Sequence, residues 1–390
     1  MEPNSTEMIT IDKLTNDLVV EILSKVPYKS FCQCKCVSKT WLSFSSNPCY
    51  CKKLPKPFTG GLIYQEHDGT AIKLVGPNPN DGSTDTSLSF VPHYELLELV
   101  DCCNGLLLCR YGSTSHLADG SKIVVCNPAT RQWTELPNPH QEQEGFHYAA
   151  KLAFDPSWSP HFYVFNFKEK CSPGVGIIGV IAVEIFSSEY SAWFVDDRWQ
   201  LQNGTNVTCR PHFFLDGRLY AQTSDDRVLV VEEFRQMEHP NHGIIVLPGY
   251  KPSSPLNDYL YGCLGQSAGV LHYAQPEIDG RNIVVWGLEE GSWNVKHRLS
   301  MSNAFGRDIF IHLDYEGFWY CDYDIQVVDL QKGLIFLRDC CTNKLLSYSM
   351  EKGTLMEIQS GFNRYMSYVP CYSMFQIGNS KNDEDLLEEP

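Results

Sequence analysis

The stretch IVVCNPATRQWTELP, at residues 123–137, has the pattern of two β-strands joined by a turn. An apolar run opens it, a polar segment follows, and a large aromatic residue comes on the return. The stretch IVVWGLEEGSW (283–293) has the same order, and eight positions separate Val125 from Trp133 and Val285 from Trp293. This spacing is typical of a hairpin that places an aromatic side chain on the return strand, facing the strand before it.

Related units recur over most of the chain. A strand pattern that begins after a glycine stands at NGLLLC (104–109), DGRLYA (216–221), AGVLHY (268–273) and KGLIFL (332–337). Two more hairpin patterns are IAVEIFSSEYSAW (181–193) and LLSYSMEKGTL (345–355). Repeats with no helices between them predict antiparallel sheets around a centre, with about 40–50 residues per four-stranded blade. Residues 58–380 therefore predict a mainly β fold, a β-propeller of roughly six or seven blades, with a pair of β-sandwiches as the alternative.

The first 57 residues follow a different pattern. LTNDLVVEILSKVP, at residues 14–27, repeats its apolar residues at helical spacing, and they cover roughly 180° of the helix circumference. A surface helix needs an apolar stripe of only about 100°. The surplus predicts two buried faces, one against the helix's own bundle and one against something else.

Two further helices are expected before residue 48. Pro27 ends the first helix, because the residue before a proline avoids the α region. SFCQCKCV (30–37) predicts the second, and Ser38 is placed to cap the third, KTWLSFSS (39–46). Chains near about 40 residues usually need a metal, a disulfide or a partner to fold. A partner is one explanation for this block, and a helical cap packed on the β domain is the other.

Residues 10–50 resemble the F-box motif. The matching positions are Leu14, Asp17-Leu18, Ile22-Leu23, Val26-Pro27, Lys29-Ser30, Lys35, Val37-Ser38-Lys39 and Trp41. The resemblance implies a three-helix module that docks on a Skp-type adaptor and, through it, on a cullin. The adaptor-binding residues that it implies are Leu14, Thr15, Leu18, Ile22, Leu23, Pro27, Val37 and Trp41. The last two either contact the adaptor or support the bundle.

One position departs from the family pattern. Thr15 stands where the family usually has proline, which would preset φ at the start of the helix. Threonine can instead cap the helix, and Asp17 in the first turn favours the helix dipole. We therefore expect the helix to form and the adaptor to be bound somewhat more weakly than by a proline-bearing relative.

The long part resembles the F-box-associated domain of plant F-box proteins. The successive motifs match in order at DCCNGLLLC (101–109), CNPATRQWTELP (126–137), LAFDPSWSPHFYV (152–164), VEIFSSEYSAW (183–193), FFLDGRLYA (213–221), LGQSAGVLHY (264–273) and VVWGLEEGSW (284–293). The resemblance implies a propeller-like domain at 58–380 that recruits a target protein for ubiquitination. The chain would then be a substrate receptor of a ubiquitin ligase, without catalysis of its own. The alternatives are an adaptor-binding scaffold or decoy outside any ligase, and a propeller enzyme such as a sugar oxidase or hydrolase.

Composition and charge narrow the function classes. The net charge is −16, with +3 in residues 1–57 and −19 in the remainder, so the β domain has no basic stripe for nucleic acid. The N-terminus lacks an apolar signal segment, and the longest apolar run, GVGIIGVIAV (174–183), is too short for a membrane helix. We expect a soluble, intracellular protein, cytoplasmic or nuclear, whose sixteen cysteines are reduced. The tail KNDEDLLEEP (381–390) is expected to be disordered.

Two motifs match active-site signatures without the context that those sites need. GQSAG (265–269) fits the nucleophile pattern around Ser267, but a strand pattern rather than a helix follows it. GVGIIG (174–179) fits the dinucleotide pattern and also runs into a strand. We therefore interpret the first as a glycine-rich turn and assign no catalytic residue and no cofactor.

No metal site is predicted either. His239 and His242 flank Pro240 and cannot share a helical face. Cys32, Cys34 and Cys36 alternate without a CxxC spacing. Three tryptophans stand at matching positions of the repeat, and we place them in the core rather than in a ligand cage: Trp133, Trp193 and Trp293.

Overall fold

The computed structural model describes residues 14–378 apart from internal stretches. Those stretches are 48, 51–52, 56–60, 67–70, 77–87, 112–121, 139–145, 173, 175, 198, 200–204, 236–239, 249–259, 316, 318 and 362. The chain divides into two compact units, Met1–Phe58 and Thr59–Pro390, which we describe one at a time. The predicted acidic tail, 381–390, lies outside the described residues, as does His239. The predicted domain limits, 10–50 and 58–380, stay predictions.

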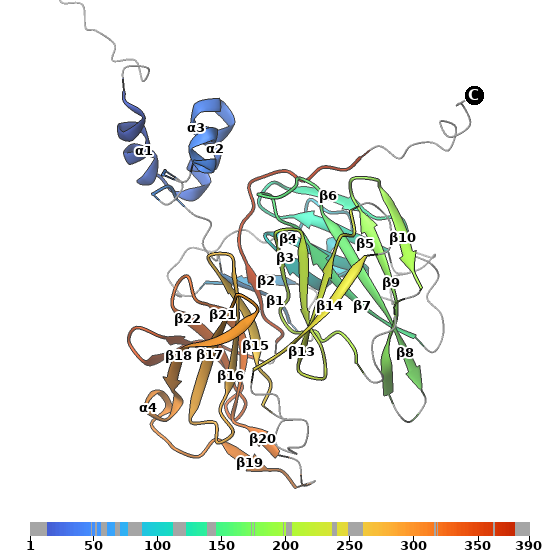
Figure 1. Ribbon diagram of the computed structural model, residues 1–390, viewed down its shortest axis with the longest axis vertical. Coiled ribbons are helices and arrows are strands. Elements are labelled where there is room, and N and C mark those ends of the chain that lie inside the picture. Colours follow the sequence, from blue (N-terminus) through green and yellow to red (C-terminus); the bar gives the residue numbers. More distant parts are fainter. Residues whose placement is uncertain are drawn as a thin grey trace, which may run out of the picture. The chain divides into compact units, whose positions relative to one another are not determined.

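Three short helices make up most of the described part of the first unit (Figure 1, blue). They are α1 (Asn16–Ser24), α2 (Tyr28–Val37) and α3 (Lys39–Ser46), in the predicted order. One apolar core joins them, and burial of its side chains stabilises helices that are each too short to persist alone. Its buried members are Val19, Val20, Leu23, Phe31, Phe44 and Leu54.

The helix ends confirm one predicted cap and correct another. Ser38 precedes α3, and its hydroxyl accepts a hydrogen bond from the backbone N–H of Trp41 at 3.3 Å. Thr15 takes the cap position of α1, and its carbonyl accepts from the N–H of Val19 at 3.0 Å. The hydroxyl of Thr15, however, makes no capping bond. The prediction that this side chain caps α1 is therefore wrong, because only the backbone of Thr15 serves the helix.

The second unit is built from antiparallel meanders, in which strands that follow each other in the chain pair with each other (Figure 1). Three separate sheets have four strands each. Their strands are β3 (Leu97–Cys103), β4 (Leu106–Tyr111), β5 (Ile123–Asn127) and β6 (Gln132–Glu135); β7 (Phe146–Ala153), β8 (Tyr163–Ser172), β9 (Gly176–Ser187) and β10 (Ala192–Asp196); β11 (Phe213–Leu215), β12 (Arg218–Gln222), β13 (Arg227–Glu232) and β14 (Asn241–Val246). A 3₁₀ turn, Tyr94–Leu96, precedes β3.

The largest sheet has eight strands and contains two consecutive meanders. The first comprises β15 (Cys263–Ser267), β16 (Val270–Pro276), β17 (Asn282–Glu289) and β18 (Ser292–Ser300). The second comprises β21 (Tyr323–Asp329), β22 (Leu334–Asp339), β23 (Lys344–Ser349) and β24 (Thr354–Ser360). The parallel pairing of β15 with β21 joins them. Between them the chain forms the helix α4 (Met301–Phe305) and a hairpin of β19 (Ile311–Leu313) and β20 (Trp319–Cys321).

A three-stranded sheet joins the two ends of this unit. It has the order β2 (Ile72–Val75), β1 (Gly61–Gln65) and β25 (Met366–Tyr368), so an early and a late segment of the chain share one sheet. Contacts link β25 and the first strands of several meanders: β25 touches β3, β3 touches β7, β11 touches β15, and β21 touches both β15 and β25. These inner strands surround a common centre, which is the propeller arrangement that the repeats predict.

The number of separate sheets differs from the prediction. Among the described residues, four sheets have four or more strands, fewer than the six or seven blades expected. The two meanders of the largest sheet count once because their inner strands pair at Gly265 and Val328. The sheet that closes the unit has three strands rather than four. The mainly β, propeller-like fold is confirmed, and the blade count is corrected.

The repeated glycine motifs form the tight turns between first and second strands. Asn104 and Gly105 have φ of 44° and 87°, and Ala268 and Gly269 have φ of 52° and 79°. A two-residue hairpin of this type needs positive φ at both central positions, which glycine adopts without steric cost. The strands predicted at 104–109 and 268–273 are confirmed in this way.

A C-terminal strap, defined here as residues 371–378, follows β25 and lies across two of the meanders. The amide of Gln132 and the backbone of Phe375 exchange two hydrogen bonds, of 2.8 and 3.0 Å. The N–H of Gly378 donates to the carbonyl of Ser188 at 2.7 Å. The ring of Phe375 is buried and meets the ring of Phe162 edge-on, with centroids 5.1 Å apart. The strap therefore belongs to the core of the second unit.

The three repeat tryptophans are less deeply buried than predicted. The indole N–H of Trp193 on β10 donates to the carbonyl of Pro137 at 2.8 Å, next to the preceding meander. The indole of Trp293 on β18 likewise donates to Val246 at the end of β14, at 2.9 Å. Trp133 is exposed. Trp193 and Trp293 thus connect one sheet to its neighbour by a hydrogen bond instead of filling the centre of the core.

Candidate functional sites

The first unit exposes large apolar side chains on α1 and α2. Leu18 is 53% exposed and Ile22 is 54% exposed, and both lie on α1 one turn apart, where side chains are neighbours on the helix surface. Val37, at the end of α2, is 78% exposed. We call these three residues the apolar surface. The helix α1 thus has both of the apolar faces that its sequence predicts, because Val19, Val20 and Leu23 fill the other one.

The remaining predicted adaptor-binding residues differ in how far their side chains are exposed. Thr15 and Pro27 are exposed, and Leu14 is half-buried. Trp41 is half-buried and packs against the core of the unit, which supports the bundle. Leu23 is only 3% exposed and belongs to that core, so its prediction as a surface residue is corrected. The physical reason is the turn of the helix, which carries Leu23 toward Val19 and away from Leu18.

Sequence reasoning passed over one exposed apolar residue in the same unit. Leu42 on α3 is 51% exposed. The sequence could have indicated this exposure, because Leu42 follows Trp41 and successive residues of a helix point in directions about 100° apart. A half-buried Trp41 therefore turns Leu42 toward a different side of α3.

The second unit contains a half-open cavity of about 210 Å³. Three connections line it: the one between β10 and β11, the turn between β12 and β13, and the one between β14 and β15. The lining residues are Thr208, Cys209, Arg210, Gln222, Thr223, Ser224, Asp226 and Tyr261. In an antiparallel meander, the second-to-third turn and the outer-to-inner connection lie at the same end of the strands. The cavity therefore opens at that end of the unit.

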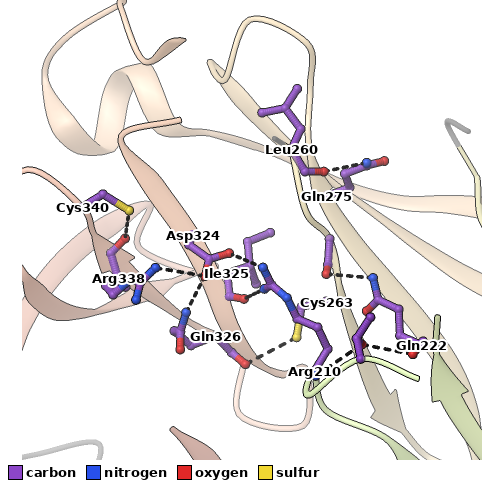
Figure 2. A network of polar contacts seen from close by, with 12 residues as sticks. Arg210, Gln222, Leu260, Cys263, Gln275, Asp324, Ile325, Gln326, Arg338 and Cys340 are labelled. Atoms are coloured by element: carbon purple, nitrogen blue, oxygen red, sulfur yellow. Dashed lines mark hydrogen bonds and ion pairs between the residues drawn. The ribbon is translucent and has the colours of Figure 1, made fainter. Parts of the chain in front are cut away.

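Arg210 is held in place by partners from a distant strand. Its guanidinium donates to the Asp324 carboxylate at 2.9 Å and to the carbonyl of Ile325 at 2.9 Å, both on β21 (Figure 2). The guanidinium also lies over the ring of Tyr261, 5.2 Å from its centroid. Burial by itself lowers the pKa of Arg210, but the neighbouring Asp324 carboxylate outweighs it and raises the pKa. Arg210 is thus a fixed cation whose charge is already matched.

Buried ionisable groups lie on the neighbouring inner strands. His212, just before β11, is bonded through Nε2 to the carbonyl of Leu152 on β7 at 2.6 Å. Asp101 on β3 accepts from the N–H of Leu152 at 2.7 Å and lies 3.5 Å from His212. Lys151 on β7 donates to the carbonyl of Arg210 at 3.1 Å. Burial lowers the pKa of both Lys151 and His212, an effect that Asp101 opposes in each case.

Family comparison identifies both units. A model of the F-box domain matches residues 11–53, and a model of the F-box associated beta propeller domain matches residues 70–237. The chain is an F-box protein with an F-box-associated domain. The F-box match includes all three helices of the first unit, and the second match includes β3 through β13.

Relatives of this F-box protein come from Arabidopsis thaliana. F-box protein At5g07610 is 27% identical over 320 residues, which cover 76% of this chain and 73% of that protein. F-box protein DOR is 30% identical over 32% of this chain and 35% of its own length. F-box protein At5g18160 is 27% identical over 36% of each. The last two matches thus span only about a third of those relatives.

Solved structures give a looser likeness. A chain of the nidogen/laminin complex aligns with 78% of this F-box protein and 95% of its own length, at a TM-score of 0.39 and 10% identity. A chain of the mitotic checkpoint complex aligns at a TM-score of 0.36 and 11% identity, over 72% of this chain and 81% of that one. Likenesses of this size carry no argument about function.

The motifs that resemble active-site signatures take part in ordinary strands. Ser267 ends β15, and the strand β16 rather than a helix follows it. Gly176 begins β9, again a strand. Within the described ranges, no three His, Cys, Asp or Glu side chains are grouped so that they could hold a metal ion. None of the described helices has the length and apolar character that crossing a membrane requires.

Buried His212 predicts that acid destabilises the F-box-associated domain. Because burial lowers the pKa of His212, the folded protein keeps the ring neutral where the unfolded chain, with a pKa of about 6.5, takes up a proton. The contribution of His212 to the free energy of unfolding is complete above the pKa that its ring has in the unfolded chain. That contribution is lost as the pH falls from there toward the lower pKa of the folded protein. We expect the free energy of unfolding to fall from pH 7 to pH 5, and His212→Gln to reduce that fall.

Urea denaturation at a series of pH values measures this slope for both proteins. The exposed His297 on β18 offers the matched control, and His297→Gln should keep the wild-type slope. Equal slopes for the wild type and His212→Gln would contradict the prediction.

Proposed function

We propose that this F-box protein is the substrate-recognition subunit of an SCF-type ubiquitin ligase. Its F-box docks on a Skp-type adaptor and through it on a cullin, and its F-box-associated domain recruits a protein target. The observation that carries the proposal is the exposure of Leu18 and Ile22 within the stretch that the F-box model matches. Apolar side chains that face water side by side on a small helical unit mark a surface for a protein partner.

The mechanism that we propose is proximity. Binding of the target by one unit and of the adaptor by the other raises the effective concentration of target lysines near the charged ubiquitin carrier. The chain itself contributes no covalent chemistry, in keeping with the non-catalytic adaptor role that its two families favour. An intracellular location, cytoplasmic or nuclear, is part of the proposal because the ligase works on intracellular proteins.

Affinity purification with proteasome inhibition tests the proposal. The full chain should retain adaptor, cullin and at least one further protein, and that protein should carry ubiquitin and accumulate when the proteasome is blocked. Ile22→Asp should lose the adaptor and cullin while keeping the further protein. An adaptor complex in which no bound protein is ubiquitinated would instead support the scaffold alternative, which shares the same F-box.

A further inference from the structure

The hairpin of β19 and β20 has an apolar face that the core covers only in part. Ile311 lies opposite Cys321, and Leu313 lies opposite Trp319. Directly opposed residues of two strands share a face, and so do residues two apart on one strand. At the inner end of this face, Cys321 is buried and Ile311 packs against the same core cluster. At the outer end, Leu313 and Trp319 are exposed, so the apolar face continues beyond the core.

More exposed apolar side chains lie around the outer end of the hairpin. Tyr315, in the turn between β19 and β20, is 98% exposed, and Ile309 before β19 is exposed as well. The turn between β16 and β17 lies beside this segment, because Nε of Arg281 donates to the carbonyl of Asp308 at 3.1 Å. That turn exposes Ile278. Several exposed apolar residues on touching segments mark an interaction site, whereas single ones are ordinary. We call the following residues the hairpin surface: Ile278, Ile309, Leu313, Tyr315 and Trp319.

The hairpin surface belongs to one end of the largest sheet (Figure 1). The connection from β18 to β21, which contains the hairpin, runs from an outer to an inner strand, and the β16–β17 turn joins a second to a third strand. In an antiparallel meander these two kinds of connection lie at the same end. The hairpin is not part of the eight-stranded sheet itself. The exposed apolar side chains are therefore an addition that the meanders do not require.

The charge around the hairpin surface is negative. Residues 307–322 contain one arginine against three aspartates and one glutamate. Arg307 lies 3.0 Å from the buried Asp322 carboxylate and is already paired there. In the neighbouring turn, Arg281 and Asp279 lie 3.8 Å apart and offset each other. The remaining acidic residues leave the hairpin surface with a net negative charge, as in the second unit as a whole.

These two properties favour a partner that is both apolar and basic. A second copy of this chain would bring like charges together, which opposes association. The phosphates of a nucleic acid would be repelled for the same reason. A protein segment with apolar side chains beside lysine or arginine satisfies both properties, because its apolar groups leave water while its charges face the acidic rim.

We propose that the hairpin surface binds a segment of the recruited protein in which apolar side chains stand beside lysine or arginine. Leu313, Tyr315 and Trp319 cover the apolar side chains, and the acidic residues around them, such as the exposed Asp308, attract the basic ones. The inference rests on the proposed function for the identity of the partner as a ligase target. The chemistry of the surface does not depend on the adaptor.

Selection from a phage-displayed library of short random peptides tests the inference. The full-length chain and its double variant Leu313→Ser/Tyr315→Ser are screened in parallel. Both substitutions lie on exposed side chains outside the core cluster and leave the net charge unchanged. Peptides recovered by the wild type should combine apolar residues with lysine or arginine. A synthesised example should bind the double variant about tenfold or more weakly in fluorescence anisotropy.

Three results would overturn the inference. One is the recovery of no peptide, or of peptides without a basic bias. The second is equal binding by the wild type and the double variant, because a basic peptide would then adhere to the acidic domain as a whole. The third is a dimer of the wild type, seen in sedimentation and lost in the double variant, which would assign the hairpin surface to a second copy of the chain.

Tyr190 supplies the matched control. It is an exposed tyrosine in the turn between β9 and β10, away from the hairpin surface in the chain, and Tyr190→Ser should bind the peptide as the wild type does. A loss equal to that of the double variant would count against the hairpin as the site. Asp308→Asn should weaken the peptide only about twofold, in line with one exposed charge pair. Salt at about 1 M should weaken it further, because it screens such charges.

The outcome is separable from that of the proposed function. The double variant should bind a purified Skp-type adaptor as the wild type does, because both substitutions lie in the second unit. Adaptor binding by a chain that selects no basic and apolar peptide would remove the hairpin inference and leave the receptor proposal intact. Peptide binding that depends on the hairpin, without adaptor binding, would do the reverse.

Discussion

Replacing Ile22 with aspartate is expected to lower the affinity of the F-box for a Skp-type adaptor by about 100-fold or more. The side chain is half exposed, so the substitution places a carboxylate on the apolar surface without disturbing the core of the first unit. An interface that buries this position would have to desolvate an unpaired charge, which is among the costliest changes that one residue can make. Surface plasmon resonance with purified adaptor measures the change.

Two further variants separate docking from folding. Asn16→Asp adds the same charge at the start of α1, away from Ile22, and should bind the adaptor normally. Leu23→Ala truncates a core side chain, which should cost about 2–5 kcal/mol of stability, and should lose adaptor binding only together with helicity. Unchanged binding by Ile22→Asp would refute the docking assignment. A loss of helicity by Ile22→Asp would show instead that the side chain supports the bundle.

Phe375→Ala is expected to destabilise the F-box-associated domain by about 3–5 kcal/mol. The ring is buried in the largest apolar cluster of the domain, beside Phe162. The backbone N–H and carbonyl of Phe375 are both hydrogen-bonded to the side-chain amide of Gln132. Truncation leaves a cavity at the point where the C-terminal strap enters the core. A change of this size is a large share of the stability of an ordinary domain. Urea denaturation followed by tryptophan fluorescence should show an earlier transition.

The neighbouring methionine supplies the comparison. Met374 is 64% exposed and precedes Phe375 in the same strap, so Met374→Ala should change the transition by less than about 0.5 kcal/mol. Similar transitions for Phe375→Ala and the wild type would mean that the strap contributes little, and that the core of the domain ends at β25.

The features that the sequence predicted correctly are local ones. A hairpin such as 123–137 depends on a turn and on two adjacent strands, all within a few residues. The cap of α3 depends on Ser38 and on the backbone three residues later. The helical wheel also showed that α1 has more apolar surface than one core needs. It did not show which part faces inward, because that depends on Phe31 and Phe44 from the other two helices.

The features that the sequence missed are long-range ones. The joining of two meanders into one sheet follows from the pairing of Gly265 with Val328, which no local pattern encodes. The cavity depends on Arg210 and Asp324, which are 114 positions apart in the chain. Gln222 has no recognisable motif around it, and only the fold shows that its amide nitrogen donates to the carbonyl of Gly262, 40 positions further along the chain.

The pairing of β1 with β25 also sets an order of events during synthesis. Gly61 lies opposite Tyr368, so the ring closes only after about 300 further residues have been made. At about 5–20 residues per second, that interval lasts roughly 15–60 s. The F-box, which lies within the first 58 residues, can be complete throughout that time, whereas β1 presents an unpaired edge.

In the proposed function, a message that ends early would therefore yield a chain that binds the adaptor but recruits no target protein. Translation of a series of messages that all include the F-box but stop at different later points, followed by adaptor capture and protease digestion, should show adaptor binding at every length and a protease-resistant β domain only once Tyr368 is present. Protease resistance in chains that stop before β25 would show that the ring does not need its final strand.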